Sequence, residues 1–372
     1  VTGDSNLKFY NGSSWVAISP GIANVVDDST PQLGGNLDLN SNNITGTGNL
    51  GDTALDSVQA GGTCNVAIGH HAGTAITTGD ANTAIGSLAL DANTTASANT
   101  ALGYAALSSN TTGSDNTAVG RSALVSNQTG DKNVAVGRNA LLVNTGSDNI
   151  AVGYQALLEN TSGTANVGIG CGGLGANQTG SNNVAVGKNG LGSNTTGANN
   201  TAIGRTAMNG NTTGTSHVAV GCGALYSNTT ADNNTAVGFK SLHANTTGYQ
   251  NTALGQNALD SNTTANHNTA IGAQTLQANT TGYANTAVGY NALCTHTTGN
   301  SNTAVGDHAM KLTTTGTFNV AVGDNALCAN TTASSNVAIG RDTMFANTTG
   351  ANNTAVGALS LDANTTASNN IA

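Results

Sequence analysis

The side chains best suited to carry chemistry in this sequence are its five cysteines and seven histidines. Pairs of thiols can form disulfides, and clusters of Cys and His can hold zinc. No Cys-x-x-Cys pair and no His pair with the spacing of zinc ligands occurs, and the one His cluster is His70–His71. We therefore expect scattered free thiols, no metal site and no cofactor. The cysteines are Cys64, Cys171, Cys222, Cys294 and Cys328.

Catalytic chemistry would need a nucleophile, a base and a group that orients the base. No such set can be drawn from the sequence, and no Gly-rich loop of the phosphate-binding type is present. The 50 Gly residues recur at regular intervals along the chain instead of gathering in one loop. We expect no enzyme.

Asparagines followed two positions later by Thr or Ser recur through the chain, which is the acceptor pattern for N-linked glycans. The same residues favour tight turns, and stacked Asn side chains form hydrogen-bonded ladders. The sequence leaves both interpretations open. The candidate acceptors are Asn93, Asn110, Asn194, Asn245 and Asn347.

The amino-acid composition limits which kinds of fold can hold these residues in place. Only 3% of the 372 residues are aromatic and 7% are charged, which is too little for an ordinary globular core. The two Pro and the many Val, Ile and Thr residues argue equally against a disordered chain. The net charge of −9 argues against nucleic-acid binding, and no apolar run approaches the ~20 residues of a membrane span.

A seventeen-residue unit explains this composition. The first unit starts at Asn65, and the unit occurs eighteen times in all, with one sixteen-residue unit at 133–148 and the start of a further unit at Asn370. The consensus is N-T-A-[VI]-G-x-x-A-L-x-x-N-T-T-G-x-x, whose positions are called places 1 to 17 below. Seventeen residues are too few for a helical repeat, whose shortest versions need ~20 or more. The unit suits one coil of a β-solenoid with coils stacked ~4.8 Å apart, in a rod roughly 85 Å long.

The places that vary least between units predict the structural ladder, meaning the rows of like residues that stack along the rod. Place 5 is always Gly, and place 9 is Leu or Met in all units but the first, which indicates a packed site because Leu and Met have similar volumes. The residues chosen to represent these two places are Gly86, Gly120, Gly204, Gly289, Leu107, Leu124, Leu259 and Leu293.

The strand T-A-[VI]-G places its two apolar residues on opposite faces. Ala at place 3 suits the inside of a thin coil, and the aliphatic residue at place 4 then points outward. Eighteen exposed aliphatic residues would form a large apolar stripe, which soluble monomers avoid. We expect the same stripe on identical chains to cover it, as in a homotrimer. A single fatter coil that buries both faces is the alternative.

Places 6 and 7 accept many residue types and are expected to face solvent. Six of the nine Lys and Arg residues lie there, and four aromatic residues share place 6. Such a row can bind surface glycans, or it can be simply the solvated corner of the coil. The candidate glycan-binding residues are Tyr104, Arg121, Arg138 and Tyr154.

The tandem NTAVG, NVAIG and NTAIG segments of residues 65–372 resemble the head repeats of YadA-like trimeric autotransporter adhesins. The resemblance implies a left-handed parallel β-roll three chains wide that binds host surfaces. Those repeats have about fourteen residues, so we expect an enlarged corner here, at NTTG.

The N-terminal part differs. LKFYNGSSWVAI (7–18) predicts two strands about an Asn-Gly turn. VVDDSTPQLGGNLDLNSNNITGTGNL (25–50) is similar to linker segments in tail-fibre proteins of marine, T4-like bacteriophages. We therefore expect two parts: an N-terminal β-hairpin and linker segment over 1–60, and the all-β parallel solenoid over 61–372, continuing beyond 372.

The two resemblances imply a rigid trimeric shaft that attaches a virion to a host surface. The partners would be identical chains and an unidentified host glycan or protein, and the location would be an extracellular virion appendage. A cell-surface adhesin or an end-to-end extracellular filament is the alternative. An ice-binding solenoid is a third hypothesis, disfavoured because no T-x-T row lies on one face of the strand.

Overall fold

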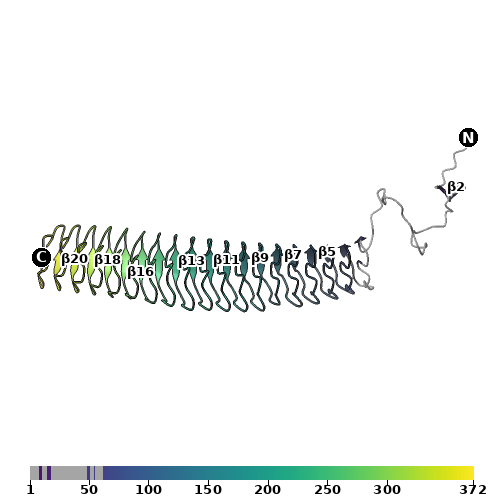
Figure 1. Ribbon diagram of the computed structural model, residues 1–372, viewed down its shortest axis with the longest axis horizontal. Helices are drawn as coiled ribbons and strands as arrows, with labels where there is room; N and C mark the ends of the chain where they lie inside the picture. Colours follow the sequence, from purple (N-terminus) through teal and green to yellow (C-terminus); the bar gives the residue numbers. More distant parts are fainter. Residues whose placement is uncertain (1–7, 11–14, 18–47, 51–53, 55–61) are drawn as a thin grey trace, which may run out of the picture. The chain divides into compact units, whose positions relative to one another are not determined.

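Each unit of the repeat forms one coil of a parallel β-solenoid in the computed structural model, which describes residues 8–10, 15–17, 48–50, 54 and 62–372 (Figure 1). Each coil contributes one three-residue strand at places 2–4, and turns form the rest of it. The predicted all-β solenoid is confirmed, with eighteen parallel strands in the repeat array and no helix among the described residues.

The array strands keep the spacing of the sequence repeat. Their bounds are β4 Val66–Ile68, β5 Thr83–Ile85, β6 Thr100–Leu102, β7 Thr117–Val119, β8 Val134–Val136, β9 Ile150–Val152, β10 Val167–Ile169, β11 Val184–Val186, β12 Thr201–Ile203, β13 Val218–Val220, β14 Thr235–Val237, β15 Thr252–Leu254, β16 Thr269–Ile271, β17 Thr286–Val288, β18 Thr303–Val305, β19 Val320–Val322, β20 Val337–Ile339 and β21 Thr354–Val356.

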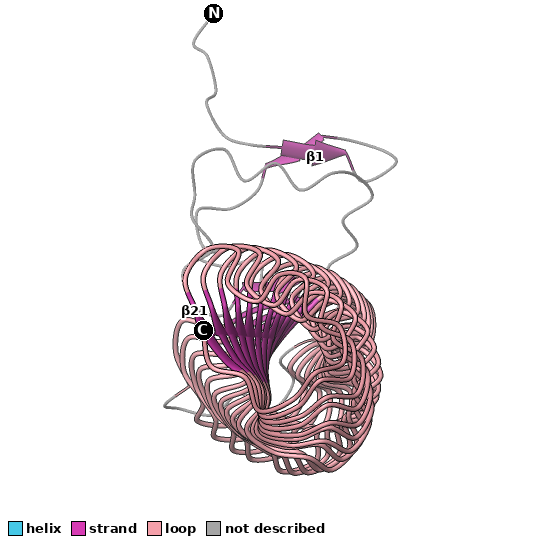
Figure 2. Cartoon of the chain, turned by 90° about the vertical axis from the view of Figure 1, so that its left-hand side faces the viewer, coloured by secondary structure: helices cyan, strands magenta, loops and turns pink. Residues whose placement is uncertain are grey.

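Every array strand pairs in parallel with the next strand along the chain, and like places face each other. Ala202 of β12, for example, pairs with Ala219 of β13. The strand β3 (Gly48–Leu50) precedes the first repeat and pairs with β4 in the same parallel manner. Seen along the rod, the strands stack behind one another on one side of the coil, and turns close the other sides (Figure 2).

The N-terminal hairpin forms as predicted. The strands β1 (Lys8–Tyr10) and β2 (Trp15–Ala17) are antiparallel, and Tyr10 pairs with Trp15. The Asn-Gly turn between them and nearly all of the linker segment 25–50 lie outside the described residues. Residues 1–45 and 46–372 form two separate units.

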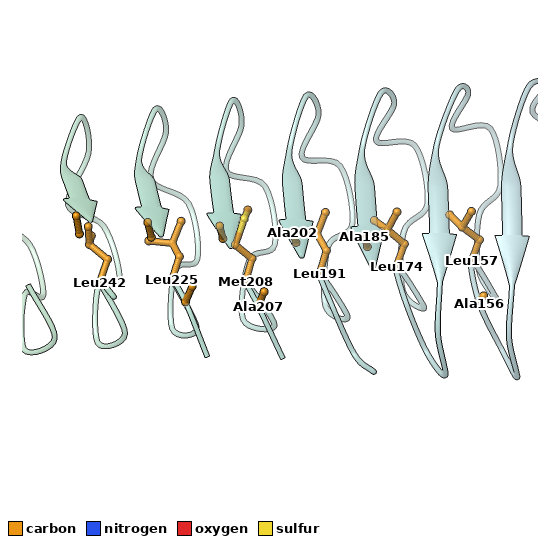
Figure 3. Close-up of a cluster of buried hydrophobic side chains, with 14 of the residues drawn as sticks. Ala156, Leu157, Leu174, Ala185, Leu191, Ala202, Ala207, Met208, Leu225 and Leu242 are labelled. Atoms are coloured by element: carbon orange, nitrogen blue, oxygen red, sulfur yellow. The ribbon is translucent and has the colours of Figure 1, made fainter. Parts of the chain in front are cut away.

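Small apolar side chains fill each coil. Ala at place 3 and Leu or Met at place 9 are fully buried in almost every coil, and Ala is fully buried wherever it occurs at place 8. The prediction that place 9 is packed is confirmed. Figure 3 shows Leu191, Met208 and Leu225 projecting into successive coils at the same position. One methionine thus replaces leucine without disturbing the ladder, because its volume is similar and its chain is flexible. The four representative leucines named above, Leu107, Leu124, Leu259 and Leu293, are among these buried residues.

The Gly at place 5 is required by both its backbone and its neighbours. Gly204 has φ +134°, and a Cβ there would lie 2.6 Å from the carbonyl oxygen of Gly221 in the next coil. Only Gly adopts this φ readily, and no side chain fits such a separation. Gly86, Gly120 and Gly289 share the same φ range and close approach.

Two ladders of asparagine occupy the polar side of the interior. Asn116 at place 1 donates from Nδ2 to the carbonyl oxygen of Gly130 at place 15, and its Oδ1 accepts from the backbone N–H of Asn133 in the next coil. Asn127 at place 12 donates from Nδ2 to the same Gly130 oxygen and to Oδ1 of Asn110. A thin coil with little apolar content thus satisfies its buried polar groups, as buried amides require.

Candidate binding surface on the outside of the coil

The outer strand face runs along the whole repeat array, from β4 to β21. Places 2 and 4 both point outward from the buried Ala of place 3, so each coil presents Thr, Val or Ile beside Val, Ile or Leu. At place 4, Ile203 is 41% exposed and Leu254 is 47% exposed. The predicted outward aliphatic row is confirmed, and a coil that buries both faces within one chain is excluded for the described residues.

A second exposed row runs along place 6, directly after the glycine that ends each strand. Tyr104, Arg121, Arg138 and Tyr154 occupy it on four successive coils, and all four are exposed. The Arg121 guanidinium carbon lies 5.8 Å from the centre of the Tyr104 ring, and that of Arg138 lies 5.9 Å from the Tyr154 ring. The prediction that place 6 faces solvent is confirmed. For place 7 it is wrong in part: most side chains there are half-buried, and Ala105 and Asn291 are buried.

The two arginines of this row carry charge that the described part of the chain does not neutralise. The ion pairs found there join His308 to Asp307 and Arg341 to Asp342, and neither includes Arg121 or Arg138. A cation over an aromatic face gains only about 0.5–1 kcal/mol at an exposed site. The row therefore keeps free hydrogen-bond donors and flat rings available to a ligand.

The candidate glycan acceptors lie inside the coil. Asn194 is fully buried; its Nδ2 donates to the Gly197 oxygen and to Oδ1 of Asn177, and its Oδ1 accepts from Asn211. A glycan on Nδ2 would have to break both of the bonds that this nitrogen donates, so the folded coil has no room for one. The same ladder buries Asn93, Asn110, Asn245 and Asn347. The ladder interpretation of this pattern is the one that the structure supports.

Two histidines replace asparagine in the interior ladders. His217 takes place 1: its Nε2 lies 2.6 Å from the Ala231 oxygen, and its Nδ1 accepts from the backbone N–H of Asn234 at 3.0 Å. These contacts fix the tautomer, with the proton on Nε2, and reproduce the two hydrogen bonds of an asparagine. Burial lowers the pKa of His217.

His296 takes place 12 and fits less well. Its Nε2 lies 2.7 Å from the Gly299 oxygen, but its Nδ1 and Oδ1 of Asn279 in the preceding coil are buried without a partner among the described residues. Burial lowers the pKa of His296 as well. The sequence signal for His217 and His296 is their position at places 1 and 12 of the repeat, where Asn is the consensus residue.

The remaining candidates are dispersed over the rod. All five cysteines are free. The rings of His70 and His71 touch edge to face with centres 4.0 Å apart. Over the described residues, no three His, Cys, Asp or Glu side chains gather to hold a metal ion, and no helix there has the length and apolar content to cross a bilayer.

Comparison with known proteins adds no family. No protein-family model matches the chain, and no curated protein is significantly similar to it in sequence.

Proposed function

We propose that this chain is a structural fibre protein, whose repeat array forms the rigid shaft of an extracellular appendage of the phage tail-fibre type that attaches to a host surface. The observation that carries the proposal is the outer strand face. It presents two parallel rows of Thr, Val, Ile and Leu over eighteen coils, with no charged side chain at places 2 and 4.

Association with identical chains is the simplest way to cover this face. A row of half-exposed aliphatic residues of this length exceeds the few hundred Å² of apolar patch that soluble monomers expose. Three copies related by an axis along the rod would bring three such faces together around that axis. The same strands would then have one face inside the coil and the other inside the trimer.

Rigidity supports the shaft role. Each coil hydrogen-bonds to its neighbours through the strand, the turns and both asparagine ladders. A solenoid of this kind contains no hinge, because each coil contacts only the coils directly before and after it. A shaft holds a recognition element away from a particle by this stiffness.

The test is a native mass measurement of the whole chain combined with electron microscopy. We expect particles of three times the 36.4 kDa chain mass that are visible as straight rods. Replacing Ile203 and Leu254 together by Lys places two charges on the outer strand face and should give monomers with an unchanged circular dichroism spectrum.

The matched control puts the same charges outside that face. Gln256→Lys with Ala273→Lys at place 6 should leave the trimer intact. A monomeric wild-type chain would refute the trimeric shaft, and a trimer that persists in the Ile203/Leu254 variant would show that another surface joins the chains.

A further inference from the structure

A shallow groove lies on the side of the rod in the four successive coils that start at Asn149, Asn166, Asn183 and Asn200. Its lining comes from places 7, 10 and 11 of the coils between residues 149 and 216, and its volume is about 350 Å³. This is near the lower end of the range of small-molecule sites, roughly 300–1,000 Å³. None of these places belongs to the outer strand face, so covering that face by identical chains does not use the groove residues.

Glycines create the groove. Gly172 at place 7 and Gly175 and Gly192 at place 10 stand where other coils carry side chains such as Leu142 or Tyr226. A Cβ at Gly172 would lie 2.7 Å from Oδ1 of Asn189. A Cβ at Gly192 would likewise lie 2.8 Å from Oδ1 of Asn209. The missing side chains therefore let the amides of the following coils lie across the floor.

These amides have unused hydrogen-bonding capacity. Gln155, Asn189 and Asn209 are half-buried, and their side chains make no hydrogen bond within the described chain. At place 7 of other coils, Asn325 donates to Asp342 and Asn291 lies 3.4 Å from His308 Nε2, whereas single amides such as Asn139 and Asn257 are unpaired there too among the described residues. The groove differs in bringing three unpaired amides together. Three planar groups that both donate and accept converge on one hollow, which suits a ligand rich in hydroxyl groups.

The neighbouring charges are mostly positive. Lys188 and Arg205 stand at place 6 of the third and fourth coils of the groove. Tyr154 stands at the same place in the first of these coils, and Cys171 in the second. From Tyr104 to Lys240, places 6 and 7 hold five cations and no acid. Glu159 is the acid that lines the groove. In a chain of net charge −9, this segregation of cations favours an anionic partner at this edge.

We propose that the groove and its place 6 edge bind an acidic oligosaccharide. Sugar hydroxyls would pair with the amides of Gln155, Asn189 and Asn209, a ring face would stack on Tyr154, and carboxylate substituents would pair with Lys188 and Arg205. The biological meaning of this site, recognition of an acidic surface glycan along the shaft, rests on the proposed attachment function. The binding itself does not.

The test is isothermal titration of the full chain with tetragalacturonate, with maltotetraose as the neutral oligosaccharide of equal length and a single-stranded DNA 20-mer as a control for charge alone. We expect tetragalacturonate to bind at least tenfold more tightly than maltotetraose. Replacing both Gly175 and Gly192 by Leu puts at place 10 of their coils the residue type that Leu158 provides in the preceding coil. This double variant should bind tetragalacturonate at least tenfold more weakly. The matched control is Gln277→Leu, at place 10 outside the groove, which should bind as wild type.

A second variant distinguishes loss of the binding site from a folding defect in the first variant. Asn189→Ala with Asn209→Ala removes the amides without adding volume and should also weaken binding about tenfold. Absence of tetragalacturonate binding, equal binding of the DNA, or unchanged binding in both groove variants would overturn the proposal. Native mass measured on the same samples reports separately on the trimer, so failure of the shaft and failure of the groove are distinguishable.

Discussion

At the scale of single residues, the interior ladders show how strictly each polar atom is assigned. His217 fits a ladder of asparagines because its Nδ1 accepts as Oδ1 does and its Nε2–H donates as Nδ2 does. A second proton would place an Nδ1–H donor against the backbone N–H of Asn234. The fold therefore requires neutral His217, in agreement with its lowered pKa.

This requirement predicts a loss of stability in mild acid. The pKa of His217 and of His296 is lowered by burial from the usual 6.5, so below pH 6.5 the unfolded chain binds more protons than the folded one. Stability contributed by these groups is present above pH 6.5 and falls as the pH drops below it, by up to about 1.4 kcal/mol per pH unit for each histidine. We expect the melting temperature of the wild type to fall between pH 7 and pH 5.

The matched variant is His217→Asn with His296→Asn, which restores the consensus residue at both places. Its melting temperature should change much less over the same pH range. His267→Asn, which alters an exposed residue outside the ladders, should melt like the wild type. Parallel pH profiles for all three chains would contradict the assignment.

At the scale of the coil, two glycines differ sharply in what they tolerate. At Gly204, a side chain would meet both the left-handed backbone and the next coil's carbonyl, so Gly204→Ala should lower the free energy of unfolding by at least about 1–3 kcal/mol. Gly190 stands at place 8, where Ala is the consensus, and no atom lies closer than 3.6 Å to an added Cβ. Gly190→Ala should be neutral or stabilise by about 0.4–1 kcal/mol. Thermal melting of the two variants compares them directly, and similar losses in both would contradict the argument.

The sequence predicts the coil well where one physical demand fixes one place. The Leu-to-Met exchange at place 9 indicated burial, and the invariance of Gly at place 5 marked it as a ladder position, which the structure explains by a backbone and a neighbouring coil that admit no side chain. The left-handed conformations of non-glycine residues were not predictable: Leu107 has φ +50° and Asn199 has φ +59°. Stacking against neighbouring coils stabilises these conformations, and residue type alone does not reveal it. The interior position of the glycan-acceptor pattern was left open for a similar reason, since Asn-x-Thr is equally compatible with an exposed turn.

The candidate sites were less predictable than the coil. Place 6 could be assigned to the surface because it varies, and the aromatic and basic row at Tyr104 and Arg121 follows from that, whereas the equally variable place 7 is mostly half-buried. The groove could not be predicted, because it arises from absent side chains at Gly172, Gly175 and Gly192 combined with amides from other coils. In the sequence, a place that varies between repeats indicates only that many residue types are tolerated there. The stacked coils show that several of these variant residues lie side by side.

At the scale of the whole array, stability is a sum over coils and their interfaces, because each coil contacts only its neighbours. Removing one complete coil should then join two compatible surfaces. Deleting residues 268–284 would bring Asn285 directly after His267 and let Thr286 pair with Thr252 as Thr269 does now. We expect a rod one coil shorter with a melting temperature close to that of the wild type.

The control deletes about half a coil. Removing residues 268–276 would leave a coil of eight residues, too short to close around its Ala and Leu core, and would set unlike places against each other at that point. Buried Asn side chains would lose their ladder partners, and each unsatisfied amide costs about 1–3 kcal/mol. Circular dichroism melting and rod lengths measured by electron microscopy distinguish the two chains. If both deletions melt alike, the array does not behave as a stack of interchangeable coils; if only the half-coil deletion is destabilised, the seventeen-residue unit is the element of stability as well as of sequence.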